Sequence, residues 1–276
     1  MSASAFRANN SVTTLLAIQN QLMFSTGIDI TSDLATTINF KHNVLPNIGL
    51  SDLKGAIPRI RYFGIGIKGY ANLTSENNLA QPYMPTAEQY DLYEAIPFRC
   101  VPNTPLEGSE ADQYRIVTTK VINGVKHYLY WLKRIAFETS TIGLTKIEGN
   151  TETTYTADTA ANLNPVPNDL FYTDVADAKT RIVASVSGVC KITGKEVLEV
   201  INNMYGGDMR RARISEFGTY SGVEVGLDTD GDLPARTEAA YTQLCTHECT
   251  LGELFDNEDH VHTRRVTFEN GSSVTL

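Results

Sequence analysis

The sequence contains little of what marks disulfide-rich or membrane-embedded proteins. Four cysteines in 276 residues are too few for a disulfide scaffold and suit a reducing compartment. No apolar run approaches the ~18 residues that a membrane-spanning helix requires. The first residues, Met1 to Arg7, lack the apolar stretch of a secretory signal. We therefore expect a protein that is made and folded in a cytoplasm.

Positive charge is also scarce. The net charge is −9 and the pI is near 5.1. Because phosphate binding depends on clustered lysine and arginine, this balance argues against nucleic acid or an anionic membrane as the main partner. The densest basic group, Arg210, Arg211 and Arg213, is too short to indicate such a surface.

The remaining composition is that of a globular chain. Hydrophobic residues make up 42% and charged residues 20%, which excludes a disordered or fibrous protein. No segment repeats with a period of 20 to 50 residues, so solenoids and propellers are excluded. The length allows one large domain or two small ones.

Capping residues predict three helices. Thr86 and Gln89 form a capping box, and so do Thr193 and Glu196; in this motif each side chain accepts the other residue's exposed backbone N–H. Apolar residues at helical spacing follow both boxes; Pro97 should end the first helix, and Gly206 and Gly207 the second. A further helix is expected after Ser11, with Val12, Leu15, Leu16, Leu22 and Met23 on it and Gly27 beyond its end.

The strongest strand signal is a hairpin around Asn123-Gly124, which is the preferred pair for a type I′ turn. This two-residue turn fixes the register, so one face pairs Ile122 with Val125, Thr118 with Leu129, and Ile116 with Trp131. The other face pairs Val121 with Lys126, Thr119 with Tyr128, and Val117 with Tyr130. Apolar groups on both faces predict that both are covered. Two explanations stay open: a neighbouring subunit covers one face, or both layers belong to this chain.

Further strands are expected at Arg59–Lys68, Arg181–Ile192 and Ala212–Val225. A second Asn-Gly pair, Asn270-Gly271, predicts a hairpin in which Ser272–Leu276 folds back on Arg265–Glu269. Long polar loops are expected at Pro102–Asp112 and Gly149–Asp169.

We predict an α+β, mostly β fold of antiparallel hairpins with a few short helices and long loops. The longer loop suggests an N-terminal lobe of residues 1–150 and a C-terminal, β-rich lobe of residues 151–276 with one helix. A single domain remains an alternative.

The most site-like segment contains Cys245, His247 and Cys249. In a strand these three side chains point to one face, where His260 or His262 could complete a tetrahedral zinc site. The spacing differs from that of a zinc knuckle, however, and free cysteines are commonly buried as small hydrophobes. We assign no metal-binding residue, and whether this cluster binds a metal stays open.

Two other motifs fail their required spacing. Asp228 to Asp232 (DTDGD) resembles the start of a calcium loop but lacks the glycine at its sixth position and the glutamate at its twelfth; we interpret it as an acidic turn. Phe63 to Gly69 (FGIGIKG) lacks both the third glycine of a dinucleotide loop and the ending of a phosphate-binding loop. Its glycines indicate a bulge or a close backbone approach.

No nucleophilic site emerges from the sequence. It has no G-x-S-x-G turn, Cys100 lies in a segment unlike that of a cysteine protease, and His42 and His127 stand alone. The many carboxylates could include a glycosidase pair, but sequence alone does not place two of them together. We therefore assign no catalytic or cofactor-binding residue and expect a protein that is not an enzyme.

Several features of the chain resemble those of bacteriophage virion proteins, especially neck, collar, head–tail connector and tail subunits. They are the segment from Ala95 to Leu106 (AIPFRCVPNTPL), the threonine- and asparagine-rich loops, the hairpins with aromatic strands and the hairpin expected at the C-terminus. The resemblance covers the whole chain, and no functional residue is carried over from it. It implies a subunit between the capsid portal and the tail, or within the tail or baseplate.

From this resemblance we expect a structural subunit of the virion that forms a homo-oligomeric ring. Its partners would be copies of itself and portal, tail or baseplate proteins, with no membrane and at most transient contact with passing DNA. The alternatives are a cell-wall or polysaccharide hydrolase, a receptor- or glycan-binding module, and a zinc-dependent adaptor.

Overall fold

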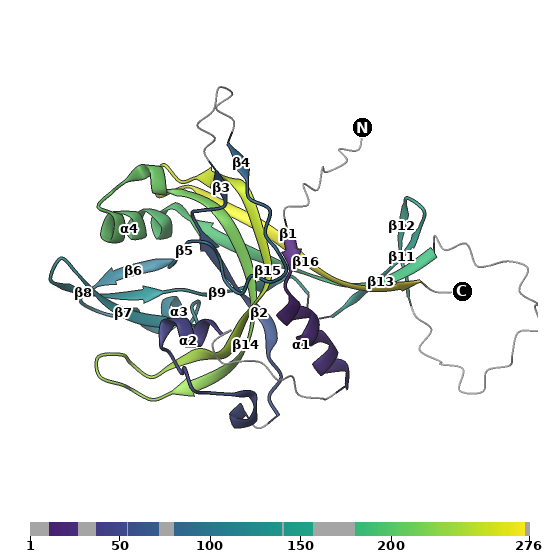
Figure 1. Cartoon of the computed structure of the whole chain (residues 1–276), viewed down its shortest axis with the longest axis horizontal. Helices are drawn as coiled ribbons and strands as arrows, with labels where there is room; N and C mark the ends of the chain where they lie inside the picture. The colour runs from purple at the N-terminus through teal and green to yellow at the C-terminus, as the bar shows by residue number, and fades with distance from the viewer. Residues whose placement is uncertain are drawn as a thin grey trace, which may run out of the picture. The chain divides into compact units, whose positions relative to one another are not determined.

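The computed structural model describes residues 11–26, 37–53, 55–71, 80–139, 141–156 and 180–273. These residues form antiparallel sheets with four helices among them (Figure 1). The predicted α+β, mostly β class is therefore confirmed. The helices are α1 (Leu15–Thr26), α2 (Ile38–His42), α3 (Gly108–Ala111) and α4 (Gly194–Tyr205), with 3₁₀ turns at Leu50–Leu53 and Met209–Arg211.

The strands fall into short and long classes. The shorter ones are β1 (Ser11–Thr13), β2 (Arg59–Gly66), β3 (Tyr70–Ala71), β4 (Gln81–Pro82), β5 (Ala95–Ile96), β6 (Arg99–Pro102), β7 (Val117–Ile122), β8 (Val125–Tyr130), β9 (Lys133–Arg134), β10 (Ala136–Phe137), β11 (Gly143–Glu148) and β12 (Thr151–Thr154). The longer ones are β13 (Thr180–Thr193), β14 (Arg213–Leu227), β15 (Arg236–Leu254) and β16 (Val261–Ser273).

The chain divides into two units. The larger contains residues 1–135 and 191–262, and the smaller contains residues 136–190 and 263–276. The boundary predicted at residue 150 falls inside the smaller unit, in the turn that joins β11 and β12.

The larger unit is built on a sheet with the order β1-β15-β14-β2-β5, in which β9 also pairs with β2. Its centre is apolar: Tyr62, Tyr220 and Leu244 are buried in one cluster. A second sheet has the order β6-β8-β7. Helix α4 is held on β6 because Glu199 accepts the backbone N–H of Cys100 at 2.8 Å and Asn203 donates to the Cys100 carbonyl at 2.7 Å.

The helix predicted after Thr193 is confirmed. The capping box with Glu196 is complete, and Gly206 ends α4 with a left-handed φ of 62°, which glycine adopts without a steric penalty. The N-terminal helix exists but begins at Leu15, because Ser11–Thr13 pairs with β15 as β1. The hydroxyl of Thr14, not Ser11, accepts the backbone N–H of Ala17 at 3.2 Å. Gly27 lies outside the described residues.

The helix predicted after Thr86 is wrong. Gln89 does accept the backbone N–H of Thr86 at 3.2 Å, but the following residues form turns and then β5. The backbone N–H groups of Tyr93 and Glu94 donate to the Glu216 carboxylate instead. A carboxylate that is distant in sequence therefore accepts the N–H groups that helical carbonyls would have accepted. Here a tertiary contact outweighs the local helix propensity.

The hairpin around Asn123-Gly124 has the predicted register from Val117↔Tyr130 to Ile122↔Val125, and both turn residues have positive φ. Tyr128, Leu129 and Tyr130 are all buried within this chain. Because these neighbours point to opposite faces, both faces of β8 are covered here by the chain's own residues. The surplus of apolar groups on this hairpin thus needs no neighbouring subunit.

The other expected strands appear as β2, β13 and β14, but the C-terminal hairpin is wrong. Strand β16 continues through Asn270-Gly271 to Ser273 and pairs with β13. Strand β13 offers a partner of 14 residues, which satisfies backbone groups of β16. Residues 274–276 of the predicted return strand lie outside the described residues.

Candidate functional site

The first candidate is a buried polar cluster between β14 and β15. Glu216 lies opposite Cys249 in the register of these strands, and His247 lies opposite Gly218. Glu216, His247 and Cys249 are at most 1% exposed. The sequence prediction that His247 and Cys249 share a face is confirmed by the 3.6 Å between Cys249 Sγ and His247 Nε2.

Cys245 does not complete this cluster. Its thiol lies 3.6 Å from the Gln243 carbonyl, and the third potential ligand is Glu216, whose Oε1 is 3.2 Å from His247 Nε2. His260 stacks on Phe255 and pairs with Glu253, so the structure gives it a different environment. Sequence reasoning missed Glu216 because its register partner, Cys249, lies 33 residues further along the chain.

The Glu216 carboxylate also accepts three backbone N–H groups. Tyr93 donates to Oε1 at 2.6 Å, and Lys68 and Glu94 donate to Oε2 at 3.0 Å. Burial alone would raise the pKa of Glu216, but hydrogen bonds from His247 and from these backbone groups lower it on balance. The carboxylate is thus held as an anion in a fixed position.

Gly66 makes room for this carboxylate. A Cβ atom there would lie 2.6 Å from Glu216 Oε2 and 2.8 Å from the Glu94 carbonyl oxygen. The prediction that the glycines of the Phe63–Gly69 segment mark a close approach is confirmed, because a Cβ atom at Gly69 would similarly meet the Ser215 carbonyl oxygen at 2.0 Å. A nucleotide plays no part in explaining these glycines.

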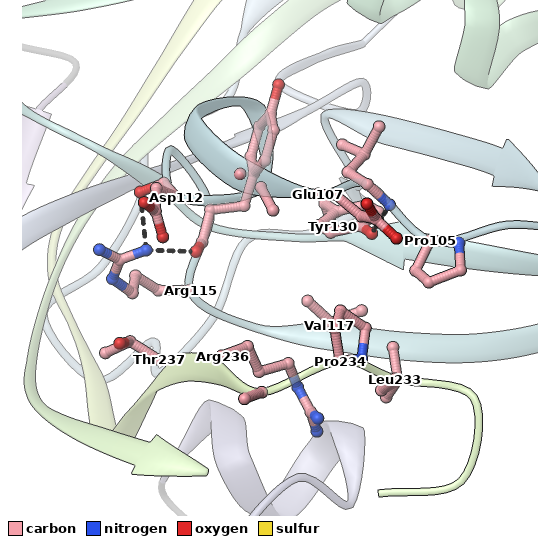
Figure 2. A pocket seen from close by; sticks show the side chains of 15 residues that line it. Pro105, Glu107, Asp112, Arg115, Val117, Tyr130, Leu233, Pro234, Arg236 and Thr237 are labelled. Atoms are coloured by element: carbon pink, nitrogen blue, oxygen red, sulfur yellow. Dashed lines mark hydrogen bonds between the residues drawn. The ribbon is translucent and has the colours of Figure 1, made fainter. Parts of the chain in front are cut away.

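The second candidate is a pocket of about 510 Å³ in the larger unit. Figure 2 shows that its labelled side chains come from the segment Pro105–Asp112, from Arg115, Val117 and Tyr130, and from the segment Leu233–Thr237. The Tyr130 hydroxyl accepts the backbone N–H of Leu106 at 2.6 Å. The loop predicted at Pro102–Asp112 thus forms one wall of this pocket, and α3 lies within it.

The two arginines of this pocket have partners inside the protein. Arg115 donates to the carbonyl of Asp112 at 2.7 Å (Figure 2), and also to the carbonyl of Tyr114 at 2.7 Å and to Glu224 at 3.0 Å. Arg236 donates through Nε to Glu238 at 2.7 Å. Burial raises the pKa of Glu238 to about 7, against the lowering effect of Arg236. These contacts are those of a buried structural network.

The third candidate is the sheet of the smaller unit. Strand β13 pairs with β10 and β11 and also with β16, and β12 pairs with β11. Leu144 lies opposite Ala184, and Phe137 lies opposite Gly188. The rings of Phe137 and Phe268 lie 6.1 Å apart. Alternation along the strands then places Lys146, opposite Ile182, and Arg264 on one face together with seven apolar residues: Phe137, Leu144, Ile182, Ala184, Val186, Val266 and Phe268.

We call these seven residues the apolar face. Each is at least partly exposed, and Phe137 is 40% exposed. Among the described residues of this unit there is no helix and no second sheet to cover it. A sheet normally buries one face against another layer, so the apolar face is the surface of this unit that lacks a visible partner in the described chain.

One comparison with known proteins found a match. The family model described as "Family of unknown function (DUF7208)" matches residues 1–274. The chain belongs to this family. Neither a curated protein nor a solved structure matches it significantly.

In this DUF7208 chain, the remaining residues singled out from the sequence are engaged in structural contacts. Burial raises the pKa of the Cys100 thiol to about 12, which opposes nucleophilic use. The Asp228–Asp232 segment is a turn, as predicted, and Asp232 pairs with Lys126 at 2.5 Å.

The histidines and the short basic group also have local partners. His42 packs against Trp131, with ring centroids 4.3 Å apart, and burial lowers its pKa to about 4. His127 Nδ1 lies 3.0 Å from the Val125 carbonyl. Arg210 and Arg211 pair with Asp208 and Glu94. No helix in the described part of the chain is long and apolar enough to cross a membrane.

Proposed function

We propose that this protein is a non-catalytic structural subunit of a bacteriophage particle that assembles with copies of itself into a ring. The observation that carries the proposal is the apolar face of the smaller unit. Seven apolar side chains on one sheet face, none of them buried, form a surface that a second copy stabilises by removing it from water. The bacteriophage setting rests on the resemblance of the whole sequence to virion proteins.

A second copy is the proposed occupant because the two edges of this sheet complement each other. Strand β12 carries Glu152 and is exposed along its whole length. At the opposite edge, β16 carries Arg264, Arg265 and Glu269, a formal charge of +2 − 1 = +1 against −1 for β12, and Arg265 also pairs with Glu138 at 2.7 Å in the same copy. Pairing of β12 from one copy with β16 from the next would extend the sheet. Such a heterologous contact closes into a ring when its rotation closes.

The mass of the protein in solution tests the proposal. We expect light scattering and native mass spectrometry to show an oligomer whose population rises with concentration. Phe137→Asp should shift the population towards the monomer, because it places a charge in the apolar face. Thr145→Asp adds the same charge to the same sheet, but Thr145 lies opposite Val183 and so on the other face; this control should keep the oligomer.

Two outcomes would overturn the proposal. A strictly monomeric protein at high concentration, with both variants indistinguishable from wild type, would remove its basis. Turnover of cell-wall or polysaccharide substrates by the purified protein would favour the hydrolase alternative instead.

DNA provides a separate check. A net charge of −9 should repel DNA from a channel wall, so that DNA passes without adhering. We expect no tight DNA binding in a fluorescence-anisotropy titration at physiological salt. Tight binding that weakens steeply with added salt would reveal a basic surface and contradict this part of the proposal.

A further inference from the structure

His247 has an unusual pair of neighbours. Its Nδ1 lies 3.0 Å from Gln89 Oε1, and its Nε2 lies 3.2 Å from Glu216 Oε1. The orientation of the Gln89 amide follows from its contacts, because Oε1 accepts the backbone N–H of Thr86 and Nε2 donates to the Tyr93 hydroxyl at 2.7 Å. Both ring nitrogens therefore face oxygen acceptors.

A neutral imidazole carries one N–H and cannot donate to both oxygens. If Nδ1–H donates to Gln89, the lone pair of Nε2 points at a carboxylate oxygen and a sulfur atom. Two arrangements relieve this: a second proton on the ring, or a cation that Nε2, Glu216 Oε1 and Cys249 Sγ share. The second arrangement matches a recurrent feature of metal sites, in which a ligating histidine donates its other N–H to an oxygen acceptor.

Two of the three distances between the donor atoms match those in a tetrahedral metal site. With ordinary zinc bond lengths, neighbouring sulfur and nitrogen ligands lie about 3.5 Å apart, and nitrogen and oxygen ligands about 3.3 Å apart. The corresponding distances are 3.6 Å from Cys249 Sγ to His247 Nε2 and 3.2 Å from His247 Nε2 to Glu216 Oε1. All three donor atoms lie within 4.8 Å of one another.

We propose that Glu216, His247 and Cys249 bind a divalent metal ion of borderline softness, such as Zn²⁺, through Oε1, Nε2 and Sγ. Mixed sulfur, nitrogen and oxygen ligands favour this class of ion over Mg²⁺ or Ca²⁺, which take oxygen ligands. The three backbone N–H groups on Glu216 and the Gln89 oxygen on His247 orient the ligands from behind. The three residues supply three ligands, so a water molecule would complete the tetrahedron.

Charge and protons balance in this step. In the arrangement with a second ring proton, the metal-free cluster consists of an anionic Glu216, a doubly protonated imidazole and a neutral Cys249 thiol. Binding of a divalent ion displaces the proton on Nε2 and the thiol proton, which pass to solvent. The cluster thus gains two charges from the ion and loses two with the protons, so its net charge in the protein interior does not change.

Cobalt substitution tests this site in the full chain. The protein is unfolded in urea under reducing conditions, refolded with Co²⁺, desalted, and examined for bound cobalt and its absorption spectrum. We expect about one equivalent of Co²⁺, with the charge-transfer absorption of a thiolate–cobalt bond and the visible bands of a tetrahedral ion. Zn²⁺ should displace the cobalt.

The cysteines supply matched variants. Cys249→Ser should remove the charge-transfer band, whereas Cys245→Ser, four residues earlier on the same strand, should keep both the band and the bound cobalt. Refolded wild-type protein without bound Co²⁺ or Zn²⁺ would overturn the proposal, as would bound cobalt without a thiolate band. The wild-type spectrum decides these points even if Cys249→Ser fails to fold. Loss of the band in Cys245→Ser would show that Cys245, and not Cys249, is the thiolate ligand.

Discussion

Glu238 illustrates how one buried side chain couples folding to pH. It is fully buried, and its carboxylate accepts from Arg236 at 2.7 Å and from the backbone N–H of Val117 at 3.2 Å. Its pKa is nevertheless raised from 4.5 to about 7 because burial outweighs these contacts. Between these two pH values the folded state holds more protons at this residue than the unfolded state does.

The contribution of Glu238 to the free energy of unfolding should therefore fall as the pH rises from about 4.5 to about 7. Glu238→Gln, which stays neutral, should remove this fall, on the order of 3 kcal/mol across the range. Urea denaturation of both proteins at several pH values measures the effect as the difference between two stability profiles. Parallel profiles would show that Glu238 titrates normally in the folded protein.

At the scale of elements, two similar capping boxes have different outcomes. The box at Thr193 caps α4, whereas the one at Thr86 precedes turns. We expect Thr193→Ala to lower the free energy of unfolding by about 1 kcal/mol. Thr86→Ala should have a smaller effect, because Thr86 is exposed and contributes its backbone N–H, which alanine keeps. Equal losses in urea denaturation would contradict the difference between the two segments.

Strand β2 depends on a glycine at one position. Gly66→Ala would place a methyl group 2.6 Å from Glu216 Oε2, so we expect it to lower the free energy of unfolding by about 1–3 kcal/mol. Gly226→Ala is the matched control on β14, because nothing lies within 4 Å of its added Cβ atom. Thermal unfolding of both variants should show a lower midpoint for Gly66→Ala alone, and an unchanged midpoint there would mean that the cluster around Glu216 is loosely packed.

At the scale of the whole molecule, assembly and stability should be coupled. If copies associate through the apolar face, the folded state is stabilised by mass action. The midpoint of thermal unfolding should then rise with protein concentration for the wild type and change less for Phe137→Asp. Scanning calorimetry over a wide concentration range measures this, and midpoints independent of concentration in both proteins would argue for a self-sufficient smaller unit.

Elements with strong local signals were predictable from the sequence. The Asn123-Gly124 turn fixes its hairpin because both residues adopt positive φ. The complete capping box and Gly206 similarly define the ends of α4. In both cases residues close in sequence supply the hydrogen-bond partners, so the local pattern determines the local structure.

Only the tertiary structure decided which distant strands became partners. The segment after Thr86 is not a helix, because Glu216 accepts the backbone N–H groups of Tyr93 and Glu94. Strand β16 pairs with β13 and does not form a terminal hairpin. The residue that lies beside His247 and Cys249 is Glu216, and not Cys245 as the sequence had suggested. The physical reason is the same in all three cases: a side chain or strand far along the chain competes with local hydrogen-bond partners. The periodicity of the sequence does not indicate which distant segment pairs with which.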